Sequence, residues 1–388
     1  MGEILVITNY YPPETGAASN RIYHLAHGLH SRGFSLTVLA PLPNYPRGKI
    51  FEDYRGHFRV SRNEDGIKIH RLWVLASNSK NKIIRLVAML SFSFSLCWYF
   101  LFNKIPETVI IQSPPLLVAH TALWFLKSKS RKMVLNVSDL WPLAGLKLGA
   151  FKHGFMYSAL ERIERANYKK ADLIMGQSEE ILEHVRLTCP DKKVMLYRNY
   201  PDIKFNLNIE HDPSEKIKLV YAGLLGVAQG IFNLCERLNY KGYEFHIYGQ
   251  GAEKNEIEKF ITSNPELPLY YHGELERSIL HKELVSFDVA IIPLLNRIYG
   301  SVPSKIFELA KLGLPILYFG GGEGEGIVNR HELGWVAKAG DYEDLNKVLN
   351  QISPDELSSA RRKTIRATAD VNFDFNQQLD KLIKFLEN

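Results

Sequence analysis

The sequence YYPPETGAASNR, residues 10–21, joins an apolar run, ILVIT at 4–8, to a helix-like stretch, RIYHLAHGL at 21–29. Two prolines stiffen this connection, and Gly16, Ala17 and a further alanine then carry almost no side chain just before the helix begins. Small residues where a strand passes into a helix allow the backbone to approach a ligand closely. We therefore expect Gly16 and Ala17 to contact a ligand. The alternative is a tight strand-to-helix connection that binds nothing.

Apolar runs of four to six residues alternate along the whole chain with longer stretches of helical periodicity. This rhythm is typical of a parallel sheet covered by helices on both faces. The runs form two sets, and we expect each set to build one doubly wound, Rossmann-like α/β domain. The predicted strands are 4–8, 35–40, 107–112, 132–137, 172–176 and 193–197 in the first set, and 218–223, 244–249, 269–273, 288–293 and 314–319 in the second.

A polar stretch without periodicity, residues 200–216, separates the two sets, and we place a linker there. The prediction is an N-terminal domain at 1–200 and a C-terminal domain at 217–370. Residues 371–388 have apolar side chains at helical spacing, so we expect a terminal helix that packs back towards the N-terminal domain. Open parallel sheets bind ligands at the carboxyl ends of their strands. Both domains have a glycine-containing loop there, so we expect them to face each other across a cleft.

The charge of the chain is uneven along its length. Residues 1–200 contain 27 basic and 15 acidic residues, whereas the remainder contains 21 and 27. A basic half favours an anionic partner, and because no nucleic-acid-binding motif is present, we expect a lipid surface rather than nucleic acid. The three cysteines lack metal-ligand or disulfide spacing, and the N-terminus lacks a leader pattern. We expect a cytoplasmic protein, peripheral at the inner face of the cell membrane.

Residues 86–102, LVAMLSFSFSLCWYFLF, form the one uncharged apolar segment long enough to raise the question of membrane contact. Three alternatives remain open: a helix covered by the first domain, a partly exposed helix that touches a membrane, or a true span. Lys80, Lys82 and Arg85 precede the segment and suit the second alternative, because cations beside an apolar face favour anionic headgroups.

The segment GSVPSKIFELAKLG, residues 300–313, has the residue types of a nucleotide-diphosphate site. We expect Pro303 in the first turn of a helix, where Ser304 and free N–H groups can bind an anion. Lys305 adds a positive charge at that end, and Glu308 follows one turn later, where its carboxylate can accept hydrogen bonds from a ribose diol. The alternative for Lys305 and Glu308 is an ordinary solvated surface.

Four segments of the chain resemble the family-4 retaining glycosyltransferases, which have the GT-B fold, and among them the bacterial surface-polysaccharide N-acetylfucosaminyltransferases. The resemblance covers nearly the whole chain and assigns Glu308 to the donor ribose. The segments are YPPETGAASNRIYHLAHGL at 11–29, ERANYKKADLIMGQSE at 164–179, YAGLLGVAQGI at 221–231 and VPSKIFELAKLGLPIL at 302–317.

The chain also departs from this family. The family has a glutamate eight positions before the glutamate that binds the ribose, and this chain has Gly300 there. Many members also have Arg and Lys in the loop after the first strand of the second domain, where this chain has Leu224 and Gln229. We expect backbone amides and Lys305 to carry the diphosphate charge, with help from Arg297 or Arg198. The predicted donor contacts are Gly16, Ala17, Arg198, Gly223, Leu224, Gly226, Gln229, Gly249, Gly273, Glu274, Leu275, Arg297 and Ser304.

In the first domain, NVSDLWPLAG at 136–145 follows a predicted strand. Many relatives have His-Asp where this chain has Ser138 and Asp139. Asp139 could orient an acceptor hydroxyl or bind the donor sugar, and the alternative is an Asx turn that caps the next segment. Asp139, Lys305 and Glu308 are the predicted catalytic residues.

The function that the resemblance implies is retaining transfer of a sugar from a UDP-sugar to a polyprenyl-diphosphate-linked acceptor in surface polysaccharide biosynthesis. No Asp-x-Asp pair is present, so we expect neither a metal ion nor another cofactor. Two alternatives remain open. A nucleotide-sugar 2-epimerase uses the same fold, and a non-catalytic nucleotide-sugar or lipid-binding subunit would explain the missing family residues at Ser138, Leu224, Gln229 and Gly300.

Overall fold

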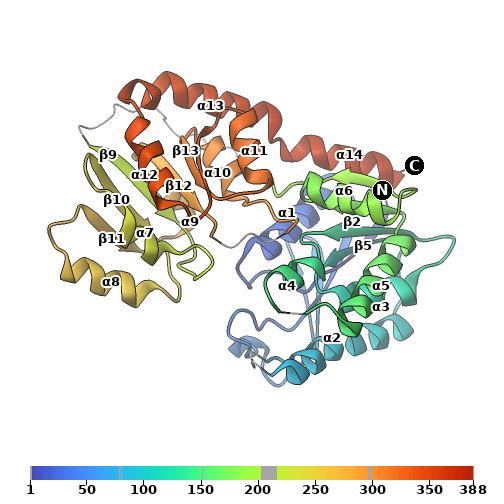
Figure 1. The fold of residues 1–388 in the computed structure, drawn as a ribbon. Helices are drawn as coiled ribbons and strands as arrows, with labels where there is room; N and C mark the ends of the chain where they lie inside the picture. The colour runs from blue at the N-terminus through green and yellow to red at the C-terminus, as the bar shows by residue number, and fades with distance from the viewer. Residues whose placement is uncertain are drawn as a thin grey trace. The chain divides into compact units, whose positions relative to one another are not determined.

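The computed structural model describes residues 2–77, 79, 81–150, 152–201, 216–295 and 299–387. The chain divides into two compact units (Figure 1). The first comprises Met1–Asn199, Ile298–Ser301 and Phe375–Asn388, and the second comprises Tyr200–Arg297 and Val302–Asp374. Most of the predicted linker at 200–216 lies outside the described residues.

The sheet of the first unit has eight strands in the order β3-β4-β2-β1-β5-β6-β7-β8. All neighbours are parallel except β3 and β4, which pair antiparallel. The strand order reverses at β1, between β2 and β5, as in doubly wound sheets that bind ligands at the carboxyl ends of their strands. The strands are β1 (Glu3–Ile7), β2 (Ser35–Pro41), β3 (Arg59–Glu64), β4 (Ile67–Leu72), β5 (Thr108–Ser113), β6 (Lys132–Val137), β7 (Leu173–Gly176) and β8 (Lys193–Leu196).

Helices cover both faces of this sheet (Figure 1). On one face the core contains side chains from α2, α3 and α6. Helices α1 and α14 pack against each other so closely that a Cβ on Gly28 would lie 2.8 Å from Leu379 Cδ2. The helices of the first unit are α1 (Ala17–Ser31), α2 (Lys82–Phe102), α3 (Leu116–Leu126), α4 (Leu143–Lys147), α5 (Phe155–Lys170), α6 (Glu179–Thr188) and α14 (Phe375–Glu387), with a 3₁₀ turn at Glu52–Tyr54.

The second unit has a six-stranded, fully parallel sheet in the order β11-β10-β9-β12-β13-β14. Its two cores lie on opposite faces, one with α7, α8 and α12 and the other with α9, α10, α11 and α13. The strands are β9 (Ile217–Ala222), β10 (Tyr243–Tyr248), β11 (Leu269–Gly273), β12 (Val289–Pro293), β13 (Ile316–Phe319) and β14 (Gly334–Ala337). The helices are α7 (Ile231–Arg237), α8 (Lys254–Ser263), α9 (Arg277–Leu284), α10 (Lys305–Lys311), α11 (Glu323–Arg330), α12 (Tyr342–Gln351) and α13 (Ser359–Asn372), with a 3₁₀ turn at Pro354–Leu357.

The predicted fold class, two doubly wound α/β domains, is confirmed. Every predicted strand is present, but β3, β4 and β14 were not predicted. The first two form a hairpin whose outer strand is almost wholly solvent-exposed, so its sequence lacks the apolar run of a buried parallel strand. The predicted terminal segment 371–388 is divided, because residues 371–374 stay with the second unit and the first unit resumes at Phe375.

Candidate functional site

Three glycines meet at the carboxyl ends of β9, β10 and β11 in the second unit. Gly223 N donates to Tyr248 O at 3.0 Å, and Gly249 N donates to Gly273 O at 2.7 Å. A Cβ added to Gly249 would lie 1.8 Å from Gly223 O, and Gly223 and Gly249 both have positive φ. Side chains do not fit where these backbones approach one another. The edge of the sheet therefore presents bare main chain at the place where open α/β sheets bind ligands.

The ammonium group of Lys305 lies against this bare main chain. Lys305 is the first residue of α10, and a Cβ on Gly223 would lie 1.8 Å from its Nζ. Nζ also lies 3.5 Å from Tyr221 Oη and 4.4 Å from the centroid of the Tyr221 ring. Burial lowers the pKa of Lys305 to about 8, and the Glu308 carboxylate opposes that shift. The predicted glycine loop and lysine are thus in contact.

Glu308 lies one turn further along α10 and is held through one oxygen. Its Oε1 accepts hydrogen bonds from Arg277 Nε at 3.1 Å, Arg277 Nη2 at 2.9 Å and His281 Nε2 at 2.6 Å. Burial acts to raise the pKa of Glu308, but the His281 hydrogen bond and the Arg277 charge outweigh it and lower the pKa to about 2. No hydrogen bond from the described residues reaches Oε2. An ionised carboxylate with one oxygen fixed and the other available can accept from a ligand diol.

Sequence reasoning missed Arg277 and His281. Both lie on α9, which begins four residues after the Gly273 strand end. The position of α9 in the sequence could have indicated both residues. This helix follows a strand whose carboxyl end lies at the same edge of the sheet as Gly223. A small cavity of about 40 Å³ lies beneath the cluster and is lined in part by His281, Lys305 and Glu308.

The other predicted donor contacts of the second unit differ in their surroundings. Leu224 is 63% exposed, and Gln229 turns back over its own loop, where its backbone N donates to Gly226 O at 2.9 Å. Ser304 precedes the first turn of α10 and makes no side-chain capping bond, and Pro303 precedes Ser304. The prediction of Pro303 inside the first turn is therefore wrong. Glu274 and Leu275 follow β11, and Arg297 lies outside the described residues.

In the first unit, a buried polar network runs beneath the carboxyl ends of β5 and β6. Arg21 Nη2 donates to Asn136 Oδ1 at 2.5 Å, and Asn136 Nδ2 donates to Gln112 Oε1 at 2.7 Å. Gln112 Nε2 in turn donates to Ser138 Oγ at 2.5 Å. Ser138, which stands where many relatives have histidine, is therefore an internal hydrogen-bond acceptor. Asp139 follows directly; burial raises its pKa to about 6, and the charge of Arg21 opposes the shift.

The structure places the first predicted loop at the same edge of this sheet. Gly16 precedes α1 with φ 138°, and Ala17 is the first residue of the helix. A Cβ on Gly16 would meet nothing within 4 Å, so the glycine is required by its backbone conformation and the space beside it is open.

Arg198, which was predicted to help bind the diphosphate, is packed inside the first unit. It belongs to the first unit, is 6% exposed, and donates from Nη1 to Gln177 O at 3.2 Å. Its main chain exchanges hydrogen bonds with the Gln378 side chain at 3.0 and 2.9 Å, which ties α14 to the end of β8. These bonds hold Arg198 within the first unit, and its contact with a diphosphate stays a prediction.

Gly300 is packed inside the first unit, which explains the missing family glutamate. Its N donates to Glu180 Oε2 at 2.8 Å and its O accepts from Ser178 Oγ at 2.8 Å. With φ 83°, a Cβ would lie 2.8 Å from Ile181 Cγ1 and 3.1 Å from Leu140 N. A glutamate side chain does not fit at this position.

Helices α2 and α3 present an apolar outer face. None of the helices in the described ranges is both long and apolar enough to cross a bilayer. Phe92 and Leu96 pack into the core, whereas the opposite side of α2 is open to solvent. We call the exposed large apolar side chains of α2 and α3 the apolar face; they are Ile83, Ile84, Leu86, Val87, Leu90, Phe94, Trp98, Leu101, Phe102, Trp124 and Phe125.

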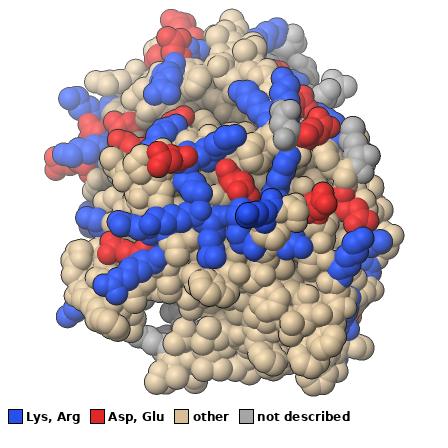
Figure 2. Space-filling view, turned by 90° about the vertical axis from the view of Figure 1, so that its right-hand side faces the viewer, with Lys and Arg blue, Asp and Glu red and all other residues tan. Residues whose placement is uncertain are grey.

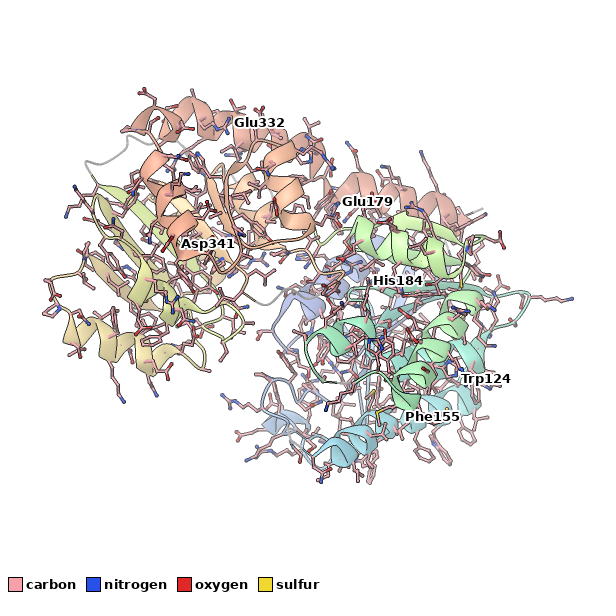
Figure 3. All side chains as sticks on the ribbon, in the orientation of Figure 1. Trp124, Phe155, Glu179, His184, Glu332 and Asp341 are labelled. Carbon is pink, nitrogen blue, oxygen red and sulfur yellow. The ribbon has the colours of Figure 1, made fainter. Side chains whose placement is uncertain are left out.

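Basic residues border this face. The segment KSKSRK at 127–132 runs from the end of α3 into β6, lines a surface hollow and begins two residues after Phe125. The Lys170 ammonium lies 4.6 Å from the Trp124 ring centroid. Figure 2 shows a band of basic side chains above an area almost free of charged ones, and Figure 3 shows Trp124 and Phe155 at the outer side of the first unit. Lys80 and the side chains of Lys82 and Arg85 lie outside the description.

Comparison with known proteins agrees with the fold. Residues 16–199 match the glycosyl transferase 4-like domain. The amylovoran biosynthesis glycosyltransferase AmsK of Erwinia amylovora is 23% identical over 265 residues, which are 63% of this chain and 64% of AmsK. The match thus spans less than two thirds of that relative.

Solved structures resemble the chain over its whole length. Sucrose-phosphate synthase from Thermosynechococcus elongatus has a TM-score of 0.75 at 13% identity and covers 100% of this chain and 98% of its own. Anabaena HepE, solved with UDP and glucose, has a TM-score of 0.63 at 11% identity, with 100% of both chains covered. Residues 16–199 are therefore a glycosyl transferase 4-like domain, and the whole chain has the GT-B fold of these solved structures.

Proposed function

We propose that this glycosyltransferase transfers an N-acetylated hexosamine or deoxyhexosamine, with retention of configuration, from a UDP-sugar to a polyprenyl-diphosphate-linked saccharide. In this proposal the second unit binds the donor and the first unit binds the acceptor. AmsK carries a name from polysaccharide biosynthesis, and HepE was solved with UDP and glucose, which support a role in surface polysaccharide assembly and a uridine donor.

The observation that carries the proposal is the placement of Lys305 against Gly223 with Glu308 one turn away. An ammonium group beside bare main chain suits a diphosphate, because its positive charge interacts with the negative charge of the ligand in a site partly shielded from water. Glu308 Oε2 then faces a ligand that can donate two hydrogen bonds, as a ribose diol does.

The chemical step follows from this charge arrangement. The bond between the anomeric carbon and the diphosphate oxygen breaks, and the bond between that carbon and the acceptor oxygen forms on the same face. The acceptor proton passes to a diphosphate oxygen, so no protein nucleophile is needed. Negative charge grows on the departing UDP, where the Lys305 ammonium stabilises it.

The apolar face supports a lipid-linked acceptor. An amphipathic surface with bordering cations binds anionic bilayers through buried apolar area and attraction to headgroups. Trp98 and Trp124 are aromatic residues of the kind that favour the membrane interface, and Lys170 and the loop at 127–132 supply the cations. The first unit then stays at the membrane surface, where a polyprenyl-diphosphate substrate resides.

A non-catalytic nucleotide-sugar-binding subunit is the second candidate, because Gly300 leaves no room for a family glutamate. The experiment that separates the two incubates the chain with radiolabelled UDP-sugars and a bacterial membrane lipid extract. Transfer of label to the lipid phase supports the enzyme. Donor binding without transfer or hydrolysis supports the subunit, and sugar epimerisation without an acceptor supports a 2-epimerase.

A further inference from the structure

A carboxylate of the protein itself occupies the N-terminus of α7, the first helix of the second unit. Glu253 lies just before α8 and is 7% exposed. Its Oε2 accepts from Ile231 N at 2.8 Å and from Phe232 N at 3.3 Å, the first two amides of α7. In nucleotide-binding α/β domains, the N-terminus of the first helix commonly binds a phosphate of the ligand. Here those two amides are already paired inside the unit.

Glu253 also holds the glycine loop that precedes α7, residues 223–230. Glu253 N donates to Leu225 O at 3.0 Å, and Leu225 N donates to Gln250 O at 2.9 Å. Leu225 is fully buried, and a Cβ on Gly251 would collide with its carbonyl oxygen. The middle of the loop is therefore fixed against the connection between β10 and α8. Through its main chain and its carboxylate, Glu253 fixes both this point and the helix that follows.

The loop that Glu253 holds borders the Lys305 ammonium. Tyr221 Oη donates to Leu224 O at 2.7 Å and lies 3.5 Å from Lys305 Nζ, so one hydroxyl joins the loop to the lysine. Gly223 begins the loop, and a Cβ there would collide with the same ammonium. Burial and the charge of Glu253 raise the pKa of Tyr221, which keeps its hydroxyl protonated and able to donate. The place of the loop beside Lys305 therefore depends on Glu253.

The first half of the loop keeps main-chain donors for a ligand. Among the described residues, Leu224 N and Gly226 N have no hydrogen-bond partner, whereas Gly223 N and Leu225 N donate to other main-chain oxygens. Leu224 is 63% exposed, so this part of the loop faces solvent. An anion beside the Lys305 ammonium can accept from these amides without reaching the N-terminus of α7.

We propose that Glu253 is a positioning residue for the donor diphosphate. Its carboxylate closes the N-terminus of α7 to the ligand and holds the glycine loop so that the diphosphate binds beside Lys305. The inference rests on the proposed glycosyl transfer, and Glu253 acts in it through the loop without touching the ligand. Two other roles give different results in the test: a helix cap that only stabilises α7, and a carboxylate that a ligand phosphate displaces.

The test measures the Kd of UDP by calorimetry and the Kd of uridine by NMR titration. We expect Glu253→Ala to bind UDP at least about tenfold more weakly, while the Kd of uridine, which lacks the diphosphate, stays within about twofold. Glu253→Gln keeps an acceptor oxygen and should bind UDP within about threefold of the parent. The matched control is Asp341→Ala, which removes the carboxylate that accepts from Asp344 N at 3.0 Å at the start of α12. It should lower thermal stability and leave both Kd values within about twofold.

Each of the other roles has its own result. If Glu253→Ala loses thermal stability but binds UDP as the parent does, Glu253 is only a helix cap and the inference is overturned. Tighter UDP binding by Glu253→Gln than by the parent would also overturn it, because the carboxylate would then repel a phosphate at α7. Where Glu253→Ala does not fold, Glu253→Asp takes its place. Its carboxylate is one methylene shorter, so it should weaken UDP binding in the same way, and parental affinity would overturn the inference.

A second readout needs no ligand. The ¹³Cε NMR signal of Lys305, identified by its absence in Lys305→Met, titrates with the ammonium group. Burial lowers the pKa of Lys305 and the charge of Glu308 opposes that shift, so release of the loop should raise the pKa from about 8 towards 10.5. We expect this rise in Glu253→Ala and not in Asp341→Ala. If the parent protein binds no UDP, the proposed function fails, and this titration still decides whether Glu253 holds the loop. An unchanged pKa of Lys305 in Glu253→Ala contradicts the inference.

Discussion

Replacing Lys305 with methionine is expected to stabilise the protein at neutral pH and to weaken its binding of UDP. Burial lowers the pKa of Lys305 from 10.5 to about 8, so the folded state disfavours the charged ammonium relative to the unfolded chain. Methionine is similar in length, carries no charge, and adapts well to an irregular space. The stability and binding effects should therefore have opposite signs.

The magnitude follows from the pKa shift. A shift of this size corresponds to about 3 kcal/mol of destabilisation at pH 7, since each unit is about 1.4 kcal/mol. The ammonium lies 4.4 Å from the Tyr221 ring centroid, and loss of that contact removes about 0.5–2 kcal/mol. The net gain expected for Lys305→Met is therefore about 1–2.5 kcal/mol. Because the pKa of Lys305 is lowered, its cost is present below pH 8 and disappears as the pH rises towards 10.5.

Urea unfolding at pH 7 and pH 10, with UDP affinity by calorimetry, checks both effects. We expect Lys305→Met to be the more stable protein at pH 7, to lose most of that advantage by pH 10, and to bind UDP at least about tenfold more weakly. Lys311→Met, in the last turn of the same helix, is the control and should show neither change. A variant that is less stable than the parent at pH 7, or that keeps its UDP affinity, would refute the reasoning.

Four further outcomes follow from the same structure. Glu308→Gln should reduce the preference for UDP over 2′-deoxy-UDP from about tenfold or more to near unity, because hydrogen bonds to charged groups contribute about 1.5–3 kcal/mol. Calorimetry measures both affinities, and the control variant Glu283→Gln on α9 should retain the preference. The pKa of Glu308 is lowered from 4.5 to about 2, so its contribution to stability is complete above pH 4.5 and is lost as the pH falls towards 2. The difference in the free energy of unfolding between the parent and Glu308→Gln, followed as the pH is lowered, measures this contribution. Gly223→Ala places a Cβ 1.8 Å from Lys305 Nζ and should lower UDP affinity, while Gly321→Ala, with nothing within 4 Å, should not; equal affinities in a calorimetric comparison would contradict the assigned contact. Trp98→Gln should lower sedimentation with phosphatidylglycerol vesicles about tenfold, from the loss of one buried aromatic side chain, and unchanged sedimentation would remove α2 from the membrane contact.

The sequence alone determined the fold class and part of the site. Buried parallel strands are apolar throughout, so the two sets of short apolar runs predicted two doubly wound sheets. Gly223, Lys305 and Glu308 were also predicted, since each lies at a strand end or a helix start that a single sequence reveals. Strand ends of one parallel sheet share an edge, so their proximity follows from local pattern alone.

Tertiary structure decided the partners of these residues. Arg277 and His281 look like surface residues of an ordinary helix until α9 is placed beside α10, where both donate to Glu308. The burial of Arg21 and the packing of Gly300 depend on segments more than 100 positions away in the chain.

The apolar segment at 86–102 shows the same division. Its composition indicated a helix but left three environments open, because composition does not say which side of a helix packs inward. In the fold, α2 buries one side against the sheet and leaves the other in solvent. Local propensity and periodicity are properties of neighbouring residues, whereas burial, pKa and hydrogen-bond partners are set by groups distant in sequence, and only the folded chain brings those groups together.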